Sequence, residues 1–131
     1  MTRFGYFDSS EFACADGTHS AWYHKHGVDV NPQLVELCNK IRKKYGRPIV
    51  VTSGYRSEEH NAKVGGVANS LHCQGQAADI KPLAKDMEHF ADFAKACYEC
   101  NANGGVGIYD SWMHVDIRGY AARWDERSGN D

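Results

Sequence analysis

The sequence of 131 residues has no long hydrophobic run and no block of like charges. No apolar stretch approaches the ~18 residues that a membrane span needs, so we expect a soluble protein without such a span. The 15 Lys and Arg residues nearly balance the 17 Asp and Glu residues, and both kinds are scattered along the chain. This balance argues against the basic surface of a nucleic-acid-binding protein, so we expect no nucleic-acid partner.

Cysteine is too sparse to build a disulfide framework. The five cysteines are an odd number spread from Cys14 to Cys100, so we expect mostly reduced thiols. Cys97 and Cys100 have C-x-x-C spacing, but a zinc ribbon needs a second pair, and we interpret this spacing as a helix end. The N-terminus has one basic residue and no apolar stretch of signal-peptide length, which predicts cytoplasmic synthesis.

The remaining composition is ordinary for one small globular protein. Hydrophobic residues make up 42% of the chain and charged residues 24%, which is too apolar for a disordered tail. The length leaves no room for a second independent core. We therefore expect a single domain over residues 1–131 and a monomer, with an aromatic and irregular segment over residues 1–30.

Hydrophobic spacing predicts two long helices and several short strands. Asn31 and Pro32 are typical of a helix start and Gly46 of its end, so a helix is expected over residues 32–45. The further expected elements are strands over 48–53, 77–81, 106–109 and 112–117, a brief helix over 57–63, a glycine-rich loop over 64–76 and a long helix over 84–101. These elements indicate an α+β fold in which a small, mainly antiparallel sheet packs against two long helices.

Two histidines and two aspartates stand out by their surroundings. His72 lies in the glycine-rich loop, and Asp79 follows in an apolar strand, where a lone carboxylate would be costly. Strand alternation places His114 and Asp116 on one face of a later strand. The imidazoles of His72 and His114 with the carboxylate of Asp79 suit Zn²⁺ with a fourth position left for water. The alternative is that Asp79 caps a turn and that both histidines belong to the core.

Four separated motifs, in order, resemble the zinc D-Ala-D-Ala carboxypeptidase family. That family includes D-Ala-D-Ala dipeptidases and phage L-alanyl-D-glutamate endolysins, and it shares its fold with hedgehog signalling domains. The resemblance covers residues 31–124. The motifs are Ser53-Gly54-Tyr55-Arg56-Ser57; His60-Asn61 with Val64-Gly65-Gly66; Ser-x-His-x-x-Gly-x-Ala-x-Asp from Ser70 to Asp79; and Gly105-Val106-Gly107-Ile108-Tyr109 with His114-Val115-Asp116.

The resemblance implies a role for each matching residue. His72, Asp79 and His114 would hold one zinc ion per chain. Arg56 would bind the scissile carbonyl or the terminal carboxylate of the substrate, which a planar guanidinium fits well. Ser70 would lie near the substrate or hold the loop that carries His72.

The function implied by the resemblance is a zinc-dependent peptidase that acts on peptidoglycan stem peptides. Metal-activated water would hydrolyse the peptide bond, with a D-Ala-D-Ala carboxypeptidase as the first expectation. Action at the cell wall would follow phage-type release, or the chain would be a domain of a larger protein. The alternative is a catalytically inactive, metal-stabilised module of the same fold that binds the cell wall.

The chain departs from this family at the general base. The best-known members carry a Glu three residues before the last zinc-binding histidine, and here that position is Ser111. Asp116 is our candidate for the base because it shares a strand face with His114. The alternative role for Asp116 is to fix a ligand or a neighbouring arginine. Trp112 is expected to form a wall of the substrate cleft, and the alternative is packing at the edge of the sheet.

His114 and Asp116 also have the H-x-D spacing of non-haem iron oxygenases. Those enzymes bind their iron with this pair and a second histidine further along a β-rich barrel. Only 15 residues follow Asp116, none of them histidine, and two long helices are predicted. The zinc peptidase is therefore the favoured interpretation.

Overall fold

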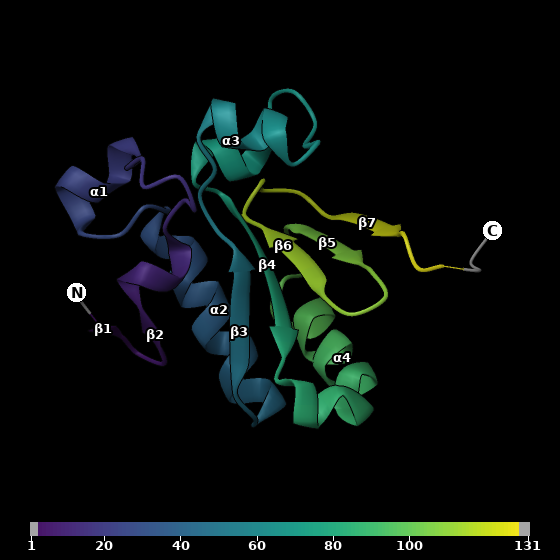
Figure 1. The fold of residues 1–131 in the computed structure, drawn as a ribbon. Coiled ribbons are helices and arrows are strands. Elements are labelled where there is room, and N and C mark those ends of the chain that lie inside the picture. The colour runs from purple at the N-terminus through teal and green to yellow at the C-terminus, as the bar shows by residue number, and fades with distance from the viewer. Residues whose placement is uncertain (1–2, 129–131) are drawn as a thin grey trace.

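A five-stranded sheet forms the centre of the protein (Figure 1), which is described here by a computed structural model over residues 3–128. The strands run in the order β3 (Ile49–Ser53), β4 (Ala77–Pro82), β6 (Met113–Asp116), β5 (Gly105–Ile108) and β7 (Ala122–Asp125). The first four are antiparallel to their neighbours, and β7 pairs with β5 in parallel. This arrangement confirms the expected α+β class with a mainly antiparallel sheet.

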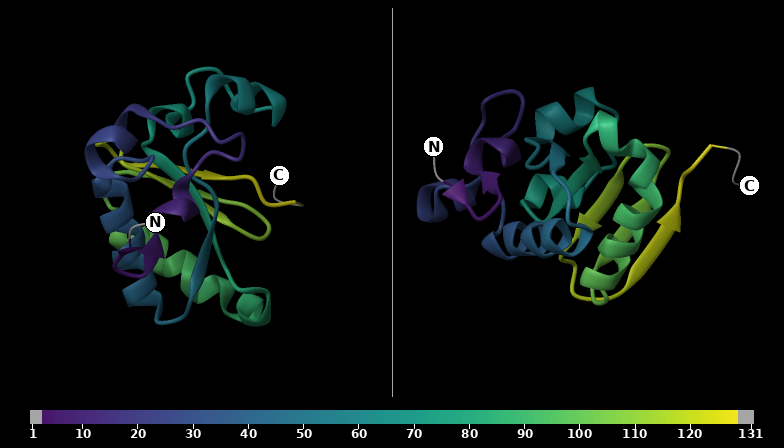
Figure 2. Two further views of the ribbon diagram at one scale, coloured as in Figure 1. Left: turned by 60° about the vertical axis from the view of Figure 1, so that its left-hand side comes forward. Right: turned by 90° about the horizontal axis from the view of Figure 1, so that it is seen from below.

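Two long helices pack together on one face of this sheet (Figure 2). Helix α2 spans Pro32–Tyr45, where the Asn31 side chain accepts a hydrogen bond at the first turn and Gly46 adopts the left-handed conformation at the end. Helix α4 spans Phe90–Cys100 and presents Phe93, Ala94, Ala96 and Cys97 to the core. Both helices were predicted, although the first turns of the second are a separate 3-10 helix over Ala84–His89.

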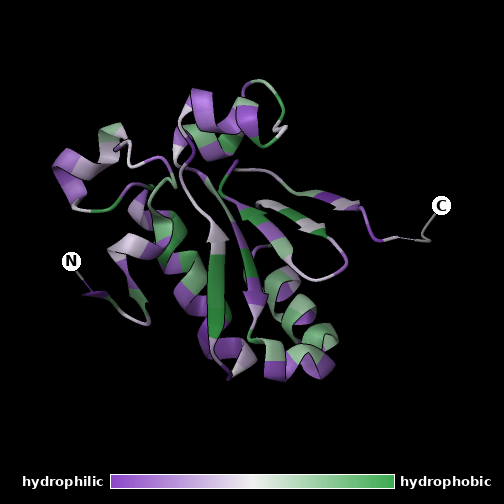
Figure 3. Ribbon diagram, in the orientation of Figure 1, coloured by the Kyte–Doolittle hydropathy of each residue, from purple (hydrophilic) through white to green (hydrophobic). Residues whose placement is uncertain are grey.

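The alternation of side chains along the central strands divides the sheet into an apolar and a polar face. Ile80 on β4 and Met113 and Val115 on β6 are fully buried in the core. Figure 3 shows hydrophobic and hydrophilic residues along the strands of the sheet. Asp79 and His114 alternate with these residues and therefore face the other side. The candidate site lies on the face that the long helices leave uncovered.

Residues 3–30 are more ordered than the sequence predicted. A two-stranded hairpin of β1 (Arg3–Phe4) and β2 (Phe7–Asp8) leads into a 3-10 helix over Ser9–Phe12, and α1 spans Ala21–His26. The side chains of Asp8 and Glu11 form a capping box. The hairpin has little signature in the sequence because its strands have two residues each.

Three smaller elements complete the fold. Helix α3 spans Glu58–Lys63. Ser57 is its N-cap residue, and the Ser57 hydroxyl accepts a hydrogen bond from the backbone of His60. The predicted loop over 64–76 contains a 3-10 turn over Leu71–Gln74. Strand β7 was not predicted. No helix among residues 3–128 is long and apolar enough to cross a membrane.

Candidate metal centre and substrate cleft

The strand register places two of the expected ligands directly opposite each other. Strands β4 and β6 are antiparallel neighbours, and Asp79 is the cross-strand partner of His114. Opposed residues on one face of a sheet have Cβ atoms only about 5 Å apart. The pairing of these strands, whose facing residues are 35 positions apart in the sequence, therefore brings a carboxylate and an imidazole into one site.

His72 reaches the same site from the 3-10 turn that precedes β4. The Ser70 hydroxyl accepts a hydrogen bond from the His72 backbone N–H at 3.2 Å and so caps this turn. The carbonyl of His72 accepts a hydrogen bond from the Arg56 backbone at 3.1 Å, which ties the turn to the segment after β3. Ser70 therefore has the loop-holding contact that was one of its two expected roles.

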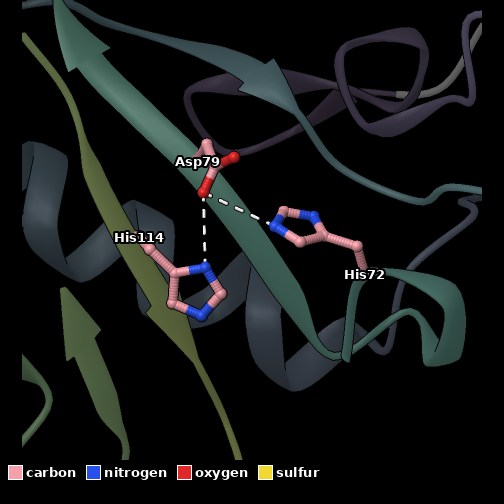
Figure 4. Close-up of side chains that lie close together, drawn as sticks. All are labelled: His72, Asp79 and His114. Atoms are coloured by element: carbon pink, nitrogen blue, oxygen red, sulfur yellow. Dashed lines mark ion pairs between the residues drawn. The ribbon is translucent and has the colours of Figure 1, made fainter. Parts of the chain in front are cut away.

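The three side chains converge from these elements (Figure 4). Oδ1 of Asp79 lies 3.4 Å from Nε2 of His72 and 3.3 Å from Nδ1 of His114. One ligand atom from each residue lies within 4.8 Å of the others. Ligand atoms on a tetrahedral zinc ion, each about 2.1 Å from the metal, are separated by about 3.4 Å. The spacing of the three donors fits such an ion.

The hydrogen bonds of the two imidazoles also fit metal binding. Nδ1 of His72 donates to the carbonyl of Gly54 at 2.8 Å, and Nε2 of His114 donates to Oδ2 of Asp116 at 2.7 Å. Because these acceptors carry no proton, the other nitrogen of each neutral imidazole has its lone pair free and turned toward Asp79. Metal-binding histidines are commonly oriented in this way.

Charge in the site is stabilised by its hydrogen bonds. Burial would raise the pKa of Asp79, but hydrogen bonds from the rings of His114 and His72, when the nitrogen facing the carboxylate carries a proton, outweigh it and keep this pKa well below its usual value. Burial would lower the pKa of His114, but hydrogen bonds to Asp116 and Asp79 raise it. The aspartate is therefore ionised at neutral pH, as a metal ligand must be.

A family model described as Peptidase M15 matches residues 5–116. The chain belongs to the M15 peptidase family. This family consists of zinc peptidases related to D-Ala-D-Ala carboxypeptidases, so the chain belongs among metallopeptidase hydrolases. No curated protein sequence matches the chain.

Membership of the M15 family also decides against the iron oxygenase alternative. That alternative needs His114 and Asp116 to bind one metal ion together. In this M15 peptidase the two side chains are instead bonded to each other through Nε2 of His114, and the donor cluster consists of His72, Asp79 and His114.

Asp116 of this M15 peptidase lies behind His114 and is fully buried. Its Oδ2 bonds His114 and Arg118, and its Oδ1 accepts hydrogen bonds from the backbone of Gly105 at 2.9 Å and from Arg118. A Cβ atom at position 105 would overlap this carboxylate, so the glycine makes the close approach possible. This geometry favours the ligand-fixing role of Asp116 over the role of general base, which needs contact with the substrate cleft.

The metal centre opens into a cleft of about 790 Å³. Arg56, Ser70 and Trp112 all line it, as do His72, Asp79 and His114. The Trp112 ring stacks on Tyr109 at a centroid distance of 4.6 Å, and both form part of the wall. Ser111 is not among the lining residues.

Sequence reasoning missed several further residues of this cleft wall, among them Trp124 and Tyr120. The indole of Trp124 lies over Gly107, where a side chain would collide with it, and donates to the Tyr109 hydroxyl at 3.0 Å. The centre of its ring lies 5.0 Å from the centre of the His114 ring. Gly107, which alternates with apolar residues in β5, was the available signal for this contact, since a glycine within a strand often marks a place where another group approaches the backbone closely.

Proposed function

We propose that the protein is a zinc-dependent peptidase that hydrolyses peptidoglycan stem peptides, with the D-Ala-D-Ala bond as the first candidate. The observation that carries this proposal is the convergence of His72, Asp79 and His114 at a cleft, with the second nitrogen of each imidazole already bonded to the protein. Membership of the M15 family supports the same chemistry. A zinc ion at such a site supplies an acidic water ligand, with a pKa near 7, and a Lewis acid for the carbonyl.

In this proposal His72, Asp79 and His114 are the zinc ligands. Asp116 holds the His114 ring, and the Gly54 carbonyl holds the His72 ring. Nδ1 of His114 is thereby presented to the metal in a fixed orientation, and less reorganisation is needed when the ion binds. These contacts act before any substrate arrives.

Arg56 and Trp112 act on the substrate in this proposal. The guanidinium of Arg56 lies 3.3 Å from Oδ2 of Asp79 and lines the cleft, so it is placed beside the metal site. From there it stabilises negative charge on the scissile carbonyl oxygen, the largest single contribution in many hydrolases. Trp112 and Ser70 line the space for the peptide.

A binding module without activity is the second candidate function, and one observation favours it. Among the described residues Asp79 is the only carboxylate that lines the cleft, and its Oδ2 is bonded to Arg56. No second carboxylate is thus in position to accept a proton from water. Hydrolysis would then depend on the acidity of the metal's water ligand, which would provide a nucleophile near neutral pH, and the leaving amine would take its proton from water.

The test of the proposed function is metal removal and restoration. We expect the zinc-loaded protein to release D-Ala from purified muropeptides, a chelator to reduce release to background, and added zinc to restore it. Mass spectrometry of the digest identifies the bond that is cut. Release that persists in the metal-depleted protein would contradict the proposal, and zinc-dependent muropeptide binding without cleavage would establish the binding module instead.

A further inference from the structure

The cleft contains two guanidinium groups, and the protein holds them differently. Arg56 donates from each of its three nitrogens to a different acceptor: Nε to Ser53 at 3.0 Å, Nη1 to Asn61 at 3.2 Å and Nη2 to Asp79 at 3.3 Å. Three of its five N–H groups are therefore taken by the protein. Arg56 is thus held by three separate acceptors, one of which is the carboxylate of Asp79.

Arg118 has a different arrangement. Its Nε donates to Oδ1 of Asp116 at 2.9 Å and its Nη2 to Oδ2 at 2.7 Å, so a single carboxylate grips one edge of the guanidinium. Such a bidentate contact fixes the plane of the guanidinium. Asp116 accepts hydrogen bonds from Nε and Nη2 of Arg118 and none from its Nη1. The side chain is 23% exposed, whereas its partner is fully buried. Arg118 thus combines a fixed orientation with access to solvent.

The surroundings place Arg118 in the cleft close to the metal centre. Its guanidinium lies 5.2 Å from the centre of the Trp124 ring, which itself packs against His114 at 5.0 Å. The guanidinium also lies 5.8 Å from the centre of the Tyr120 ring. The residues that line the cleft here are Arg118, Trp124, His114 and Tyr120. Aromatic rings that cover a guanidinium reduce its contact with water and strengthen its interaction with an anion.

The charge of the cleft favours an anionic ligand. Arg56 and Arg118 bring two positive charges to its lining and Asp79 one negative charge, with the carboxylate of Asp116 buried behind the wall. A divalent ion at the metal centre adds two positive charges. A peptide with a free carboxylate would therefore be attracted to this cleft more strongly than its neutral amide.

We propose that Arg118 forms a carboxylate-binding subsite, which takes a free carboxylate of the peptide substrate beside the metal centre. The inference rests on the proposed function and makes it more specific, since it selects acidic over amidated peptides. The carboxylate comes from one of two sources, the C-terminus of the peptide or an internal D-isoglutamyl residue. Arg118 is held ready by Asp116, so its orientation is already set when the ligand binds.

The experiment compares two pairs of peptides on the zinc-loaded protein. One pair is an acyl-D-Ala-D-Ala peptide and its C-terminal amide, and the other differs only in D-isoglutamate against D-isoglutamine. The value of kcat/KM is measured for each, and binding is measured by calorimetry with analogues whose scissile amide is reduced to an amine. We expect the wild type to prefer the acid in one pair by ~10-fold or more, as for a charge-assisted hydrogen bond. The pair that shows the preference identifies the source of the carboxylate.

Arg118→Gln should reduce that preference to less than ~3-fold, because the neutral side chain forms no charge-assisted bond. The matched control is Arg127→Gln, since Arg127 makes the same bidentate contact with Asp125 but does not line this cleft. A preference that survives Arg118→Gln, or a wild type that prefers neither acid, overturns the inference.

Removing Arg118 alone leaves the buried Asp116 carboxylate without its main partner, which destabilises proteins. The double variant Asp116→Asn with Arg118→Gln removes both charges, and it must lose the binding preference in the same way. The two proposals fail separately. Hydrolysis without an acid preference overturns the subsite alone, and an Arg118-dependent acid preference in binding without hydrolysis overturns the peptidase alone.

Discussion

Replacing Asp79 by alanine is expected to abolish zinc binding and hydrolysis together. Asp79 contributes the only carboxylate of the donor cluster, and its Oδ1 lies between the nitrogens of His72 and His114. Without it two imidazoles remain, and the positive guanidinium of Arg56 loses its partner beside the metal position. A divalent ion then has too few ligands and an unfavourable charge next to it.

The measurements are zinc content per chain and the zinc-induced rise in the unfolding temperature. A ligand that binds only the folded state raises this temperature, so the rise should be present in the wild type and absent in Asp79→Ala. His72→Ala should behave in the same way. His89→Ala is the control histidine, because His89 lies in the 3-10 helix before α4 and outside the cleft. Wild-type zinc affinity in Asp79→Ala would remove Asp79 from the ligand set.

The grouping of His72, Asp79 and His114 could be predicted because its parts have strong local signals. Asp79 was conspicuous as a charge in an apolar strand, and the alternation on β6 put His114 on the polar face. The sequence could not give the register between β4 and β6, on which the cross-strand pair of Asp79 and His114 depends. The family resemblance supplied that long-range information, since contacts between distant strands leave no local pattern.

The orientation of the second ring nitrogens could be predicted only in part. The bond from His72 goes to a backbone carbonyl, that of Gly54, and a backbone acceptor has no residue type by which it could be recognised. The pair of His114 and Asp116 was visible because strand neighbours two residues apart share a face. The sequence pattern does not show that Asp116 lies behind His114 and outside the cleft lining, and its role as general base stays a prediction.

The wall formed by β7 was beyond the reach of sequence patterns. This strand has four residues, half-buried or exposed, and pairs in parallel with β5 at the edge of the sheet. Short edge strands carry little apolar alternation, so hydrophobic spacing does not reveal them. Trp124 and the position of Arg118 relative to it follow from this pairing and became visible only in the folded chain.

Asp116→Asn is expected to weaken zinc binding by about 10–100-fold, the usual effect of removing a group that orients a metal-binding histidine. Asparagine keeps the shape of the side chain but lacks the charge that bonds His114 and Arg118. The prediction separates the two roles considered for this residue. Loss of a general base would leave zinc affinity unchanged and lower kcat by ~10²-fold or more.

The pH dependence of zinc binding provides a second readout. Asp116 and Asp79 raise the pKa of His114 against the effect of burial, so protons compete with zinc for this imidazole at a comparatively high pH. With asparagine at position 116 the pKa of His114 falls, and the zinc affinity, expressed relative to its value at high pH, should decline on acidification with a midpoint at lower pH than in the wild type. Asp125→Asn is the matched control, because Asp125 binds Arg127 bidentately away from the cleft. Unchanged zinc affinity and an unchanged pH profile in Asp116→Asn, together with a large fall in kcat, would restore Asp116 as the base.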